Sequence, residues 1–191
     1  MAISLQKGEN TNLSNAAPGM SKMVVGLGWN ARGTSGEAFD LDASAFMLNA
    51  GDKVPSDANF IFYNQDKSPD GSVKYMGDNR TGDGDGDDET IVIELDRVPA
   101  GIEKIAVCVT IHQASERNQN FGQVSGAFIR CVDASTNQEV ARFDLSEDFS
   151  VETAVVFGAI YRNSGAWKFR AVGQGYSGGL QELCGVYGIQ I

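Results

Sequence analysis

Short apolar runs separated by turn residues recur along the whole chain, and this pattern favours a strand-rich fold. In Thr90–Leu95 the residues Ile91, Ile93 and Leu95 alternate with more polar positions, as in a strand with one buried face. Asn163–Ala166 predicts a hairpin turn between two such runs. Further strands are expected at Met23–Trp29, Phe39–Leu48, Asn59–Asn64, Ile105–Ile111, Gly126–Val132, Val155–Arg162 and Trp167–Val172.

Helical periodicity is sparse. Ala114–Asn120 is long enough for about two helical turns. Near the C-terminus, Leu180, Leu183, Cys184 and Tyr187 form one apolar helical stripe, which predicts an amphipathic helix packed on a sheet. The expected fold class is therefore all-β: a β-sandwich of two packed sheets with one or two short helices, including a C-terminal amphipathic helix. We expect a single domain over residues 1–191, because no linker interrupts the pattern.

The net charge of −10 disfavours unaided binding to nucleic acid or to anionic lipid, which attract Lys and Arg. Divalent cations and basic partners fit this charge better. Met1–Gly8 lacks the basic start and apolar core of a signal peptide, and no apolar run approaches the ~20 residues of a membrane-spanning helix. We expect a cytoplasmic protein with no nucleic acid among its partners and no direct membrane insertion.

Three cysteines, Cys108, Cys131 and Cys184, are far apart in the sequence and form no Cys-x-x-Cys pair. This spacing disfavours a disulfide framework or a thiolate zinc site and fits a reducing compartment. Cys108 lies in the apolar run Ile105–Ile111, so we expect it to be a small buried hydrophobe.

The segment Asp78–Glu89 carries six acidic residues and one arginine and so supplies half of the net charge. Its aspartates Asp83, Asp85 and Asp87 alternate with glycines. Carboxylates this close repel one another, and glycine raises the entropic cost of ordering the segment. A bound cation removes both costs. The alternative is a solvated acidic turn, but such a turn has no need of glycine-spaced aspartates directly before an apolar strand.

The ion expected at this segment is Ca²⁺. The candidate ligands are all oxygens, and the chain has one histidine, which disfavours zinc and copper. Mg²⁺ retains its waters and needs fewer carboxylates. An EF-hand starting at Asp83 is excluded, because its sixth position is Asp88 instead of glycine and its twelfth, Glu94, falls in a predicted strand.

Other segments offer further oxygen ligands. Asp40 and Asp42 lie two residues apart in a predicted strand, so their side chains share one face, which is either solvated or ligated to metal. Asn64 offers an amide oxygen at a strand end, although a turn residue is the simpler interpretation.

Eight segments carry a family resemblance: Ser4–Gly8, Val25–Trp29, Phe39–Ser44, Phe60–Gln65, Gly77–Glu89, Asn120–Val124, Asp144–Asp148 and Trp167–Gly175. Together they resemble the TerD family of tellurium-resistance and stress proteins, and they span nearly the whole chain. Gly77–Glu89 is the most specific of them because it is long and of unusual composition. Segments as short as Ser4–Gly8 carry little weight alone.

The resemblance implies a cytoplasmic β-sandwich that binds two Ca²⁺ and acts in resistance to tellurite and to other stresses, phage and colicins included. Carried over residue by residue, it implies metal ligands at Asp78, Asn79, Asp83, Asp85, Asp87, Asp88 and Glu89, supported by Asp40 and Asp42. The family usually has aspartate after its Gly-Trp pair, where this chain has Asn30. If that position coordinates metal, the lost charge weakens binding there.

The sequence favours a protein that is not an enzyme. Reduction of tellurite needs paired thiols, a flavin or a nicotinamide cofactor, and the chain has no vicinal cysteines. His112 is the only histidine, and beside Ile111 and Gln113 it is more simply a strand-end residue than a catalytic base. We expect a calcium-dependent interaction module whose partners are other stress-resistance proteins, in the cytoplasm or at the inner face of the membrane.

Two other functions remain open at this point. The family resemblance also implies a sensor of small molecules such as cyclic nucleotides, in which Arg130, Arg162, Lys168 and Arg170 could meet a phosphate, although each is more simply a solvated strand residue. The third function is a metal-dependent hydrolase that uses the calcium centre.

Overall fold

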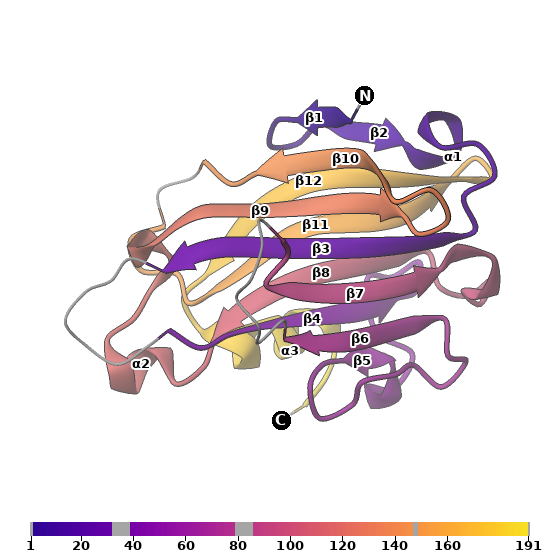
Figure 1. Cartoon of the computed structure of the whole chain (residues 1–191). Helices are drawn as coiled ribbons and strands as arrows, with labels where there is room; N and C mark the ends of the chain where they lie inside the picture. The colour runs from indigo at the N-terminus through magenta and orange to yellow at the C-terminus, as the bar shows by residue number, and fades with distance from the viewer. Residues whose placement is uncertain (1, 32–38, 79–85, 147–148, 191) are drawn as a thin grey trace.

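Two six-stranded sheets pack face to face and form a β-sandwich (Figure 1). The structure, a computed structural model, describes residues 2–31, 39–78, 86–146 and 149–190. Sheet A consists, in spatial order, of β1 (Ile3–Leu5), β10 (Gln138–Asp144), β9 (Val124–Asp133), β3 (Lys22–Ala31), β7 (Glu89–Glu94) and β6 (Val73–Asp78). Sheet B consists of β2 (Asn10–Asn12), β12 (Ala166–Tyr176), β11 (Ala154–Asn163), β8 (Lys104–Ile111), β4 (Leu41–Leu48) and β5 (Phe60–Ile61). The expected all-β sandwich is confirmed.

Helices in the described residues are short. They are α1 (Leu13–Ala16), α2 (Ala114–Arg117) and α3 (Gly179–Tyr187), with 3-10 turns at Asp57–Asn59, Leu95–Arg97 and Phe121–Gln123. The predicted C-terminal helix is α3, and it packs on the outer face of sheet B through Leu183 and Cys184. No helix in the described part of the chain is long and apolar enough to cross a lipid bilayer.

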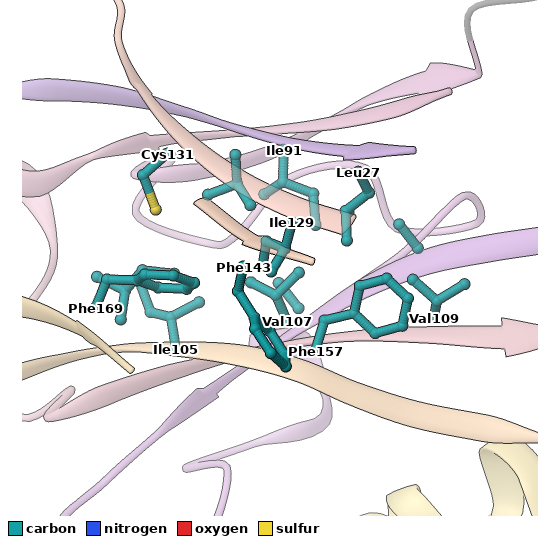
Figure 2. Packing of buried hydrophobic residues seen from close by; sticks show 14 of the residues in the cluster. Leu27, Ile91, Ile105, Val107, Val109, Ile129, Cys131, Phe143, Phe157 and Phe169 are labelled. Atoms are coloured by element: carbon teal, nitrogen blue, oxygen red, sulfur yellow. The ribbon is translucent and has the colours of Figure 1, made fainter. Parts of the chain in front are cut away.

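The core lies between the sheets and is filled from both. In β7 every second residue is buried, so Ile91 and Ile93 face inward as the alternation predicts. Figure 2 shows side chains of sheet A, such as Leu27 and Ile129, pointing toward Val107 and Phe157 of sheet B. Cys108, Cys131 and Cys184 are all buried free thiols, and the burial of Cys108 confirms the expectation from its apolar run.

The β11–β12 hairpin has the predicted two-residue turn. Asn163 pairs with Ala166, and the turn residues Ser164 and Gly165 have φ angles of 52° and 76°. Positive φ at both positions is the type I′ arrangement, whose twist matches that of the flanking strands.

Several expected boundaries differ from the structure. In place of a strand over Asn59–Asn64, β5 covers only two residues, because Phe62 and Gln65 exchange backbone hydrogen bonds and turn the chain. The strand expected from Phe39 begins at Leu41. The helix expected over Ala114–Asn120 ends at Arg117, since Asn118 adopts a left-handed conformation.

Candidate functional site

An acidic cavity of about 690 Å³ opens at one end of the sandwich. Residues at the ends of β3, β4 and β7 line it together with residues of β6 and of the segment after β8. Its polar lining includes Asp40, Asp42, Asp88, Glu89 and His112. Asp40 and Asp42 thus line the same cavity as Asp88 and Glu89, two acids of Asp78–Glu89. We call this space the acidic cavity.

Glu89 is the most buried acid of the cavity, with 4% of its surface exposed. Its Oε2 accepts a hydrogen bond of 2.6 Å from the backbone N–H of Ala43, and its Oε1 accepts one of 2.9 Å from the hydroxyl of Tyr75. Because β5 pairs only with Ala45 and Phe46, it leaves the edge of β4 uncovered at Ala43, where Glu89 binds. A buried carboxylate needs such donors, and these connect β7 to β4 and β6.

Asp88 is held against the end of β3. Its Oδ2 accepts a hydrogen bond of 2.7 Å from the backbone N–H of Trp29, and its own N–H donates to the carbonyl oxygen of Leu27, also at 2.7 Å. Two contacts on one strand fix the direction in which the Asp88 side chain enters the acidic cavity. The sequence gives no sign of the Trp29 contact, which depends on where β7 starts relative to β3.

Asp40 and Asp42 lie on the opposite wall, at the start of β4. Asp40 is exposed and Asp42 is partly buried. The carbonyl oxygen of Asp40 accepts a hydrogen bond of 2.8 Å from the N–H of His112, which holds this segment against the end of β8. Hence one wall of the cavity comes from sheet B and the other from sheet A.

Asp87 points away from the acidic cavity. Its carboxylate lies on the outer face of sheet A, where Oδ1 accepts a hydrogen bond of 2.7 Å from Nε of Arg130 and Oδ2 one of 3.1 Å from Nη2. A Cβ atom on Gly26 would lie 2.1 Å from Oδ2 of Asp87, so only glycine fits there. Arg130 also pairs with Glu139 at 3.3 Å, and hydrogen bonding to Asp87 raises the pKa of its guanidinium.

Sequence reasoning missed this contact, although two signals were present. Arg130 interrupts the apolar stretch Ala127–Val132, and a cation in such a strand needs a partner. Gly26 lies inside a strand, where glycine marks a close approach.

The remaining predicted ligands are only partly located. Asn79, Asp83 and Asp85 lie outside the described residues, and so does the side chain of Asp78. Among the residues that the structure does describe, no three His, Cys, Asp or Glu side chains are close enough to hold a metal ion. Asn30 and Asn64 do not line the acidic cavity; the amide of Asn30 lies instead against Gly126.

The four cations considered for a phosphate site do not meet. Arg130 lies in sheet A and is paired with Asp87, whereas the other three belong to sheet B. Arg162 donates to the carbonyl oxygens of Val98 at 2.7 Å and Ile102 at 3.0 Å, and it stacks on Trp167. Lys168 and Arg170 lie on β12.

The comparisons with known proteins agree on one family. A model of the TerD domain matches residues 1–187. The tellurium resistance protein TerD of an Alcaligenes species is 61% identical over 189 residues, which are 99% of this chain and 98% of that protein. General stress protein 16U of Bacillus subtilis is 52% identical over the full length of both chains.

The fold also occurs among solved structures. A homologue of telluride resistance protein (TerD) from Streptomyces coelicolor A3(2) superposes with a TM-score of 0.67 at 24% identity, over 86% of this chain and 95% of that one. At this identity the similarity concerns the fold alone.

Proposed function

The chain belongs to the TerD family, and we propose that it is a calcium-binding stress-response protein that contributes to tellurite resistance without being an enzyme. Two relatives that match almost its whole length are named for tellurium resistance and for general stress, which supports this role. Its place is the cytoplasm, where it acts as a calcium-dependent interaction module with other stress-resistance proteins at the inner face of the membrane.

The observation that carries the proposal is the position of the acidic cavity. β6 ends at Asp78 and β7 starts at Glu89, so both strands that flank the acidic segment reach this cavity, and Gly77 lines it. Across the cavity lie Asp40 and Asp42 of sheet B. Carboxylates from distant parts of the sequence therefore line one cavity, and the most acidic segment of the chain, Asp78–Glu89, begins and ends at it.

The donor chemistry fits Ca²⁺. Carboxylate oxygens dominate the polar lining, and Ca²⁺ takes six to eight oxygen ligands in flexible geometry. No three described acids are close enough to hold an ion by themselves, so Asp40, Asp42 and Asp88 would hold the ions only together with Asp78, Asn79, Asp83 and Asp85. Bound calcium would neutralise these carboxylates.

Asp87 and Glu89 have different roles in this proposal. Asp87 anchors the end of the acidic segment to Arg130, and Glu89 joins the two sheets. Calcium at the acidic cavity then links the segment between β6 and β7 to the start of β4, and the surface completed in this way is what a partner recognises.

The test is a strain whose only copy of the gene carries Asp83→Asn and Asp85→Asn. We expect soluble protein at normal levels, while tellurite resistance and calcium-dependent capture of partner proteins are both lost. A matched strain with Asp66→Asn and Asp96→Asn, two exposed acids outside the cavity, should keep both. Full resistance in the first strain, with calcium binding shown to be absent in the purified protein, would contradict the proposal.

A further inference from the structure

A second cavity, of about 790 Å³, lies on the outer face of sheet B beside α3. Its lining includes residues of β8, β11 and β12, and none of its lining residues belongs to the acidic cavity. Its volume is within the range of small-molecule sites, which is about 300–1,000 Å³. We call it the basic cavity.

The floor of the basic cavity follows from one row of paired residues across sheet B. Ala106 of β8 pairs with Ala159 of β11, and Ala159 pairs with Arg170 of β12. On the other side, Ala106 pairs with Phe46, whose ring lies 4.7 Å from that of Tyr187 in α3. Two adjacent alanines therefore leave a shallow apolar hollow between an arginine and an aromatic wall.

The rim of the basic cavity is positively charged. Lys7, Lys53, Lys104 and Arg170 line it against one carboxylate, Asp52. This concentration of cations is unexpected in a chain with a net charge of −10. Because a cleft lined mostly by charges of one sign focuses the electric field, such a rim attracts anions.

Contacts with described residues hold Lys104 and Lys53 in place. Nζ of Lys104 pairs with Oδ1 of Asp52 at 2.5 Å, and Nζ of Lys53 donates to the carbonyl oxygen of Val186 at 2.5 Å. The side chain of Arg170 is exposed and makes no hydrogen bond or ion pair within the described residues. Its guanidinium can therefore bind an oxyanion with two parallel hydrogen bonds.

Tyrosines complete the wall. Tyr161, Tyr176 and Tyr187 all line the basic cavity. Tyrosine hydroxyls are protonated at neutral pH, and burial raises the pKa of Tyr176 and of Tyr187 further, so both can donate to an anion. Their rings also offer flat apolar surface.

We propose that the basic cavity binds a small organic anion, whose planar apolar body rests on Ala106 and Ala159 and whose phosphate or carboxylate group lies at Arg170. The apolar floor, the aromatic wall and the single unpaired guanidinium together select a ligand with one charged end and one flat end. This site is independent of the calcium proposal, because it uses other residues on another face.

The experiment uses the full chain in EDTA, so that calcium has no part in the result. Phenyl phosphate and benzoate are added as probes, and inorganic phosphate and benzyl alcohol serve as half-ligands that carry only one end each. Binding is measured by calorimetry and by amide chemical shifts. We expect the two aromatic anions to bind more tightly than either half-ligand, with shifts centred on Ala106, Ala159 and Arg170. The tighter of the two anions identifies the charged group.

Three variants locate the site. Arg170→Gln removes the charge and both parallel hydrogen bonds of the guanidinium, so it should weaken binding by about tenfold or more. Ala159→Leu should fill the apolar hollow with a larger side chain and weaken ligand binding further. Lys168→Gln is the matched control, because Lys168 is a cation two residues away on the same strand face but does not line the cavity. It should bind like the parent.

The proposal is wrong if neither aromatic anion produces shifts localised at this row. If Arg170→Gln and Lys168→Gln weaken binding equally, the binding depends only on the overall charge of the protein, and the proposal is also wrong. Equal affinity for benzyl alcohol and phenyl phosphate would show that the cationic rim has no role. None of these results bears on calcium binding.

Discussion

Oε2 of Glu89 accepts a hydrogen bond of 2.6 Å from the backbone N–H of Ala43, and this bond joins the first residue of β7 in sheet A to β4 in sheet B. It lies at the acidic cavity, between the strand that follows the acidic segment and the strand that carries Asp42. Closure of the sandwich at this end and the geometry of the candidate calcium site therefore depend on the same carboxylate.

Glu89→Ala should destabilise the protein in the absence of calcium. The change leaves the N–H of Ala43 and the hydroxyl of Tyr75 without an acceptor in a buried position, at a cost of about 1–3 kcal/mol. For a domain of this size, the melting temperature should fall by roughly 3 to 10 °C. Thermal unfolding in EDTA measures it.

The control is Glu116→Ala, which removes an exposed glutamate of α2 and should leave the melting temperature nearly unchanged. If both variants melt like the parent, Glu89 does not join the sheets in solution.

Much of the fold followed from local pattern. The alternation in Thr90–Leu95 and the turn at Asn163–Ala166 each depend on neighbouring residues only, and both appear in the structure. β1, β2, β6 and β10 were not expected. β2 reads Asn-Thr-Asn and has no apolar face of its own, so its pairing with β12 decides its conformation.

The candidate site shows the same limit. Sequence pattern identified Asp40, Asp42, Asp88 and Glu89, and the structure brings them to one cavity. The sequence pattern could not distinguish the roles of these acids, because the roles depend on long-range contacts. Glu89 binds Ala43, which is 46 residues away in the sequence, and Asp88 binds Trp29, which is 59 residues away. For Asp87, membership of an acidic run suggested a metal ligand, whereas its carboxylate lies against Arg130.

Asp85 and Asp87 should therefore respond differently to the same change. Asp87→Asn weakens the pair with Arg130, so we expect a loss of stability of about 1–2 kcal/mol and a change in calcium affinity below about threefold. Asp85→Asn should lower calcium affinity by about tenfold or more with the stability of the calcium-free protein unchanged. Calorimetry and urea unfolding separate the two effects.

Arg130→Gln is the matched variant, since it breaks the Asp87–Arg130 ion pair by changing the other residue. It should reproduce Asp87→Asn in both measurements. A loss of calcium affinity in Asp87→Asn that Arg130→Gln does not share would make Asp87 a ligand instead of an anchor.

The native cysteines should be nearly inert toward thiol reagents. Burial raises the pKa of the Cys184 thiol to about 11 and raises those of Cys108 and Cys131 as well. A raised pKa leaves less thiolate at a given pH, so at pH 8 only about one Cys184 in a thousand is ionised. Reaction with Ellman's reagent should be slow and should accelerate as the pH rises toward 11.

In guanidinium chloride all three thiols should react rapidly, which gives the reference. Fast reaction of one thiol in the native protein would mean that the helix or strand covering that thiol, such as α3 for Cys184, opens readily.

The most direct test of the central claim is a thermal melt of the purified protein in calcium, in magnesium and in EDTA. A ligand that binds only the folded state adds about 2.7 kcal/mol at a hundred times its dissociation constant. We therefore predict that calcium raises the melting temperature by roughly 5 to 10 °C relative to EDTA, and that magnesium at the same concentration gives a clearly smaller rise. Identical melting in calcium and EDTA would contradict calcium binding, and an equal rise with magnesium would contradict the choice of ion.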